Sequence, residues 1–280
     1  MTEPMLKTGK RPAQYHPELT RLVDIKTSIG LATPIYKSSF GYGNDFHNGP
    51  TGWKILGNGP PDDNSIPQAD AAALQGAGDC AWAGSAHETM LLCKNARRPV
   101  PKFTGLNILQ QYSAYSGYDL VTGANDNGSD VVEVLKWRQT KGLVDASGGI
   151  HKIGVFVSLE VGNLTELWEA LYYFDTVGLG INFPESAMTQ LNQGQIWSVV
   201  SGAQIEGGHY IPLVGRPTAN TWTCITWGQR QIMTEQFVTT YMDEAYCYIT
   251  LERYNAVTGE TPQGVKDYDL EKYLYSLPKQ

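Results

Sequence analysis

Two residues far apart in the sequence have the chemistry of a nucleophile and its base. Cys80 follows the Gly-rich turn QGAGD and opens the run CAWAGSAHETMLLCKN, which is rich in Ala, Leu and Met. This composition predicts a helix from about Cys80 to Asn95. The dipole and the free N–H groups at a helix N-terminus lower the pKa of a thiol. Cys80 is therefore interpreted as a nucleophile, against the alternative of one more buried helix cysteine.

His209 is the predicted base for this thiol. It follows Gly207 and Gly208 and opens the apolar stretch YIPLVG, which predicts a strand that fixes the imidazole at the edge of a sheet. An imidazole titrates near neutral pH and forms a stabilising ion pair with a thiolate. We therefore expect Cys80 and His209 to face each other across one cleft.

The other histidines are weaker candidates. His87 shares the helix face of Cys80, but two helical turns place it about 10 Å along the axis. That distance is too long for direct proton transfer, so we expect a structural role for His87. Three histidines of the five stand in loop or turn contexts and are interpreted as surface residues: His16, His47 and His151.

Three segments, taken together, resemble the papain-like cysteine peptidases. QGAGDCAW is similar to the segment with the oxyanion Gln and the nucleophile, GGHYIPLVG to the His strand, and CITWG to the strand with the orienting residue and a shielding Trp-Gly pair. The order of the three is that of the family, and the resemblance runs from about Gly52 to Leu251. It implies that Gln75 and the Cys80 N–H bind the oxyanion and that Trp227 shields His209.

The sequence departs from the family pattern at the orienting residue. Ile225 stands where an Asn is expected, and it cannot hydrogen-bond an imidazole, whereas the neighbouring Thr226 can. The spacing from Gln75 to Cys80 is also one residue shorter than usual, and the half-cystine normally found upstream is absent. A triad without its orienting residue is weakened and not abolished, because the oxyanion hole acts independently.

Three functions therefore remain open. The first is a cysteine-dependent peptidase or amide hydrolase that acts on a peptide or protein and needs no cofactor or metal. The second is a weak or inactive papain-like fold that serves as a structural or binding component of a larger assembly, for example a phage particle, and Ile225 motivates it. The third is acyl transfer of the transglutaminase kind, with the same Cys and His.

The order of predicted elements indicates an α+β fold with a helical half packed against an antiparallel sheet. Helices are expected over LNILQQYSAYSGYD, over SDVVEVLKWRQTKGLV with Ser129 as N-cap, and over NLTELWEALYYFDTVG. The last third contains three β-rich runs, GGHYIPLVGR, NTWTCITWGQ and EAYCYITLERY, and a short helix, MTEQFVTTYMDE. We expect one papain-like domain over 52–255, an N-terminal arm over 1–51 that docks on it or acts as a propeptide, and a tail over 256–280.

Composition and charge exclude several classes of protein. The chain has 280 residues, 41% of them hydrophobic and 18% charged, and a net charge of −7. The acidic balance argues against a nucleic-acid partner, and no apolar run is long enough to cross a bilayer. The first residues lack the apolar core of a Sec signal, so we expect a cytoplasmic protein, or a virion-associated one if a phage encodes it.

Four cysteines stand without a CxxC pair, which favours a reducing compartment over a zinc or disulfide framework. Two disulfides in an oxidising setting are the alternative. Cys93, Cys224 and Cys247 are interpreted as core residues without chemistry. We interpret three carboxylates as hydrated groups of a loop and a helix start, namely Asp126, Asp130 and Glu133. Calcium binding is their alternative role.

Overall fold

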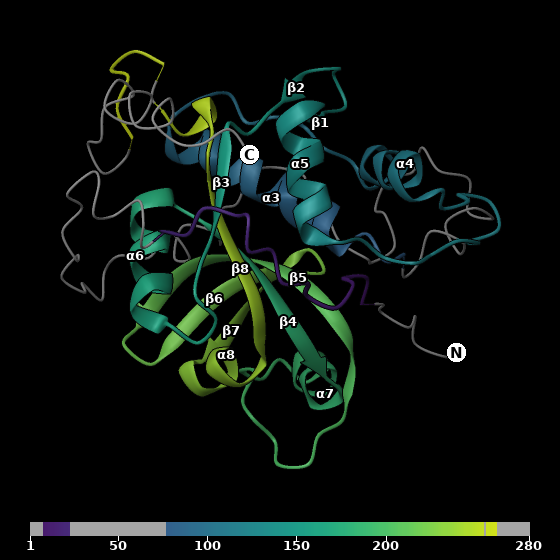
Figure 1. Cartoon of the computed structure of the whole chain (residues 1–280), viewed down its shortest axis with the longest axis vertical. Coiled ribbons are helices and arrows are strands. Elements are labelled where there is room, and N and C mark those ends of the chain that lie inside the picture. Colours follow the sequence, from purple (N-terminus) through teal and green to yellow (C-terminus); the bar gives the residue numbers. More distant parts are fainter. Residues whose placement is uncertain (1–7, 23–76, 255, 262–280) are drawn as a thin grey trace.

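A computed structural model describes residues 8–22, 77–254 and 256–261. Figure 1 shows a group of helices beside a twisted antiparallel sheet, with the helices earlier in the chain than most of the strands. The predicted α+β fold, with a helical half followed by a sheet half, is confirmed. Gln75, His47 and the expected domain start at Gly52 lie outside the described residues.

Three helices form the first half, and each begins close to where the sequence predicts it. Their bounds are α3 Cys80–Asn95, α4 Gly105–Ser116 and α5 Val131–Thr140. The N-cap of α5 is Asp130 and not the expected Ser129, because the Asp130 carboxylate accepts the backbone N–H of Glu133. Ser129 instead accepts a hydrogen bond from the Trp82 indole at 3.0 Å and so links α3 to the start of α5.

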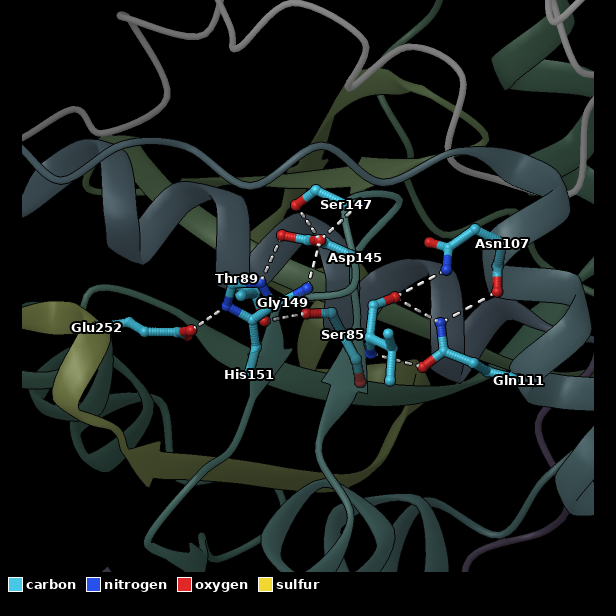
Figure 2. Close-up of polar contacts among 10 residues, drawn as sticks. Ser85, Thr89, Asn107, Gln111, Asp145, Ser147, Gly149, His151 and Glu252 are labelled. Atoms are coloured by element: carbon cyan, nitrogen blue, oxygen red, sulfur yellow. Dashed lines mark hydrogen bonds and ion pairs between the residues drawn. The ribbon is translucent and has the colours of Figure 1, made fainter.

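A short hairpin, β1 Leu143–Val144 and β2 Ile150–His151, closes the helical half. His151 lies between two carboxylates, with Asp145 on its Nε2 at 3.0 Å and Glu252 on its Nδ1 (Figure 2). Glu252 belongs to the 3₁₀ turn η3 Leu251–Arg253, more than a hundred residues further along the chain. The hairpin is thus tied to the end of the sheet half by one imidazole and two acids.

The sheet has six strands in the order β3-β8-β4-β5-β6-β7, and all neighbours are antiparallel. The strands are β3 Val155–Ser158, β4 Val177–Pro184, β5 Ile205–Thr218, β6 Thr221–Thr226, β7 Gln229–Thr234 and β8 Met242–Ile249. The helices of this half are α6 Leu164–Phe174, α7 Glu185–Asn192 and α8 Glu235–Tyr241. The three predicted β-rich runs become β5, β6 and β8 of this one sheet.

Helix α3 is buried almost throughout and packs against β5. Gly84 allows the close approach, because a Cβ there would lie 2.7 Å from the Tyr210 ring. Further along α3, the Glu88 carboxylate accepts a hydrogen bond from the Tyr210 hydroxyl and pairs with Arg138, each at 2.8 Å. The buried charges are therefore matched, and this network fixes α3 against the strand that carries His209.

Residues 8–22 form a segment, here called the arm, that docks across the two halves. Gly9 packs backbone to backbone against Gly78, so closely that a Cβ on Gly9 would lie 2.1 Å from Gly78 atoms. The Lys10 N–H donates to the Gly208 carbonyl, and the Arg11 N–H donates to the Ser129 carbonyl, each at 2.9 Å. The arm therefore runs as an extra extended segment between the loop that precedes α5 and the start of β5.

Candidate active site

Cys80 is the first residue of α3 and has almost no exposed surface. The backbone N–H of Tyr210 donates to its Sγ at 3.4 Å, and the backbone of Gly9 in the arm acts with it to lower the pKa of the thiol. The expected position of the thiol at a helix N-terminus is the position observed. The contact with the residue after His209 brings the two predicted chemical groups to the same place.

His209 lies on β5 and is held by residues of the turn that joins β6 to β7. Its Nε2 is 2.8 Å from Thr226 Oγ1. Trp227 stacks on the imidazole with 4.3 Å between ring centroids and 10° between the planes. The orientation of the ring is thus fixed at one nitrogen and over one face.

The Trp-Gly pair shapes the backbone of the turn between β6 and β7, in addition to placing an indole over His209. Trp227 and Gly228 are the two central residues between paired Thr226 and Gln229, and both have positive φ, 43° and 68°. Two-residue hairpins favour positive φ at both central positions, which suits Gly and strains Trp. Contacts of the indole with His209 and Phe183 hold Trp227 in that conformation.

Cys80, His209, Thr226 and Trp227 line one small pocket of about 10 Å³. That volume is about what one water molecule needs. The His209 Nδ1 is buried and has no hydrogen-bond partner among the residues that the structure describes. His87 also lines this cavity, because it lies on the same face of α3 as Cys80.

Burial sets the protonation of the pair in this closed arrangement. Loss of hydration raises the pKa of the Cys80 thiol to about 11 and lowers the pKa of His209 to about 3. Both groups are therefore neutral near pH 7, which differs from the thiolate–imidazolium pair expected from the sequence. The hydrogen bonds from Tyr210 and Gly9 favour the thiolate, but the desolvation of the sulfur outweighs them.

Asp79 is a titratable neighbour of the thiol that the sequence did not single out. It is the N-cap residue of α3 and is buried, and burial raises the pKa of its carboxyl to about 7. Its Oδ1 has no hydrogen-bond partner within the described part of the chain. An ionised Asp79 raises the pKa of Cys80, so protonation of Asp79 favours the thiolate form of Cys80.

The turn before Cys80 is shaped by Asp126, whose Oδ1 accepts the Gly78 N–H at 2.9 Å and the Tyr112 hydroxyl at 2.7 Å. Asp130 caps α5, and Glu133 pairs with Lys136. Within residues 8–22, 77–254 and 256–261, no cluster of three His, Cys, Asp or Glu side chains is arranged to hold a metal ion. These three carboxylates thus have structural partners.

The structure also gives the positions of most of the other residues that the sequence singled out. Gln75, the expected oxyanion donor, lies outside the described residues. Ile225 is buried beside the cavity and leaves the imidazole contact to Thr226. The other three cysteines, Cys93, Cys224 and Cys247, are buried and form no disulfide, and the same holds for Cys80.

No helix among the described residues has both the length and the apolar character needed to cross a membrane.

Comparisons with known proteins place the architecture. No protein-family profile and no curated protein sequence matches the chain. Xylellain, a cysteine protease from Xylella fastidiosa, superposes with a TM-score of 0.61 at 13% identity over 89% of this chain and 99% of its own. Procathepsin L2 from the larval midgut of Tenebrio molitor gives 0.57 at 10% identity, over 89% of this chain and 80% of its own. Procathepsin B S9 from Trypanosoma congolense gives 0.50 at 9% identity, over 88% and 86%.

Each of these similarities covers 88% or 89% of the chain. Identities of this size establish architecture and leave the chemistry to be argued from the site itself. The chain has the fold of the papain-like cysteine proteases.

Proposed function

We propose that the protein is a cysteine-dependent peptidase or amide hydrolase in which Cys80 is the nucleophile and His209 the base. The observation that carries the proposal is the shared cavity of the thiol and an imidazole whose Nδ1 is unpartnered among the described residues. The tautomer with its proton on Nε2 donates to Thr226 Oγ1. It leaves the Nδ1 lone pair to take the proton of the Cys80 thiol.

The proposed reaction needs only these groups and water. Cys80 Sγ attacks the carbonyl carbon as its proton passes to His209 Nδ1, and the imidazolium then protonates the leaving amine as the C–N bond breaks. Water, deprotonated by His209, hydrolyses the thioester and restores the thiol. The Cys80 N–H and Gln75 are the proposed donors to the oxyanion, while Thr226 and Trp227 hold the imidazole.

The arm makes the described arrangement a closed form of this enzyme. Gly9 contacts the sulfur and Lys10 pairs with the residue before His209, so a substrate backbone and the arm exclude each other there. We propose that residues 8–11 must leave before a substrate binds. Release rehydrates both groups, lowers the pKa of Cys80 and raises that of His209, which favours the thiolate–imidazolium pair.

The test compares the rate of alkylation of Cys80 in the full-length chain with the rate in a Lys10→Met variant, in which the arm loses its charged anchor. We expect slow alkylation of the intact chain at pH 7 and a rate in the variant above that of free cysteine. Cys80→Ala must abolish labelling and His209→Ala must return the rate to that of an ordinary thiol. If arm release leaves Cys80 no more reactive than free cysteine, the proposal of a thiol hydrolase is wrong.

A further inference from the structure

The most completely satisfied charge of the arm is Lys10, whose side chain is fully buried. Its ammonium donates to Asp243 Oδ2 at 2.9 Å and to the Arg11 carbonyl at 2.8 Å, and it pairs with Glu244 Oε1 at 2.8 Å. These three partners use all three N–H donors of the ammonium. Such an arrangement is a built receptor for a primary ammonium and is unlike a surface ion pair.

The Glu244 carboxylate has a partner outside the arm. Glu244 accepts the Tyr246 hydroxyl at 2.9 Å on its second oxygen, Oε2, so only Oε1 faces Lys10. Both acids belong to β8, which is hydrogen-bonded to β4 in the middle of the sheet. The backbone of both acids and the carboxylate of Glu244 are therefore held by contacts that do not involve the arm.

A glycine provides the room for the side-chain stem. A Cβ on Gly180 of β4 would lie 2.6 Å from Lys10 Cε and 2.5 Å from Glu244 Cγ. A larger residue at this position fills the place of the lysine stem. Gly180 and the two acids thus form a recess, here called the Lys10 pocket, that is long enough for an unbranched side chain and acidic at its end.

The Lys10 pocket lies directly beside the proposed catalytic pair. The Lys10 N–H donates to the carbonyl of Gly208, which precedes His209, and the backbone of Gly9 packs against Gly78, two residues before Cys80, and lowers the pKa of its thiol. The side chain in the pocket is therefore one residue away from the backbone that contacts the nucleophile. Asp243 and Glu244 also border a cavity of about 380 Å³ that later residues of the arm line as well.

We propose that the Lys10 pocket is the specificity pocket of the enzyme and that it selects substrates with a lysine or arginine next to the residue at the scissile bond. This inference rests on the proposed function for the position of the scissile bond, although the pocket binds a basic side chain whether or not a bond is cut. Lys10 is then the chain's own occupant of the site that a substrate must fill.

Two measurements on the full-length Lys10→Met chain test the pocket. The first is calorimetric binding of a peptide that copies residues 8–15, TGKRPAQY, against the same peptide with norleucine in place of its lysine. The tethered arm competes equally with both peptides, so the ratio of their Kd values is unaffected. We expect the lysine peptide to bind at least about tenfold more tightly, the effect of a hydrogen-bonded charge. Lys10→Gln replaces Lys10→Met if the latter does not fold.

The second measurement is kcat/KM for fluorogenic peptide substrates that differ only in lysine or norleucine at the residue after the scissile one, because Lys10 follows Gly9 in the arm. Adding Glu244→Gln to the arm variant is expected to remove the lysine preference in both measurements. Adding Glu160→Gln, which neutralises another acid bordering the same cavity, is expected to leave it unchanged. Adding Gly180→Val is expected to weaken binding of both peptides by filling the stem position.

The outcomes separate this inference from the proposed function. Equal binding of the lysine and norleucine peptides, or a preference that survives Glu244→Gln, overturns the Lys10 pocket even if both substrates are cleaved. Lysine-selective binding without cleavage of any substrate supports the pocket and contradicts the hydrolase. Equal kcat/KM for the two substrates shows that the pocket does not set specificity.

Discussion

The buried Asp79 carboxyl leads to a prediction about how folding stability depends on pH. Burial raises the pKa of this group to about 7 in the folded chain, while an unfolded Asp titrates near 3.9. Between these values the folded state holds a proton that the unfolded state has lost. The contribution of Asp79 is therefore fully present below the unfolded pKa and is lost as the pH rises toward 7.

The magnitude follows from one proton. Across pH 4.5 to 6.5 Asp79 lowers the free energy of unfolding by about 1.4 kcal/mol for each pH unit. Asp79→Asn removes this slope, since an amide does not titrate. The free energy of unfolding of the variant, relative to the wild type, should rise by about 2.7 kcal/mol over these two units. His209 and the other groups titrate in both chains, and the difference isolates Asp79.

The assay is urea unfolding of both proteins at pH 4.5, 5.5 and 6.5, with the difference in free energy plotted against pH. Asp119→Asn is the matched control: Asp119 is exposed, and hydrogen bonds from the Thr122 and Val121 backbone lower its pKa, so it stays ionised across this interval. Its substitution should leave the slope unchanged. A flat difference for Asp79→Asn would refute the reasoning, because it would mean that an ionised carboxylate adjoins the nucleophile throughout this pH range.

Three further substitutions test the site and its support. Thr226→Val removes the hydroxyl bonded to His209 Nε2 and should lower kcat/KM of the arm-released chain about tenfold, whereas Thr226→Ser keeps the oxygen and most of the activity; equal rates would show that Thr226 does not position the ring. Glu88→Gln breaks the buried pair with Arg138 and should cost about 3–5 kcal/mol in urea unfolding, against about 1 kcal/mol or less for Glu133→Gln in an exposed pair; equal losses would contradict the matched-charge network. Burial lowers the pKa of His151, but Glu252 and Asp145 outweigh this and raise it, so the stability that its charge contributes is present below its unfolded pKa near 6.5 and is lost as the pH rises through the folded value. His151→Gln should accordingly lower the unfolding midpoint more at pH 5.5 than at pH 9, and a loss independent of pH would exclude this ion cluster.

The sequence predicted those parts of the site that depend on local signals. A Gly-rich turn before an Ala-rich run marks the start of α3, and an apolar stretch after two glycines marks the strand of His209, so the positions of both residues in their elements could be predicted. Trp-Gly is a local signal too, because it forms the whole two-residue turn between β6 and β7. The choice of Thr226 over Ile225 as the imidazole contact followed from which side chain has a hydroxyl.

Long-range packing accounts for what the sequence did not predict. Lys10 and Asp243 are 233 positions apart, and nothing in either neighbourhood marks them as partners. Asp79 is buried beside Gly78, which packs against Gly9 of the arm and donates to Asp126, and the charge of Asp126 adds to the rise in the pKa of Asp79. Ser129 looked like a helix cap but contacts Trp82 and Arg11, because the loop before α5 is held by the arm and by α3.

The protonation of the proposed catalytic pair and the occupancy of the Lys10 pocket both depend on how residues 9 and 10 of the arm are seated. Gly9 and Lys10 are consecutive, so a backbone shift that withdraws the ammonium from Glu244 also lifts Gly9 from the Cys80 sulfur. The rate of Cys80 alkylation and the affinity for a lysine peptide should therefore rise together in Lys10→Met. A variant that binds the peptide but keeps a slow thiol would contradict the proposed hydrolase and would show that Tyr210 and Ile225, which also border the cavity, desolvate the sulfur without help from the arm.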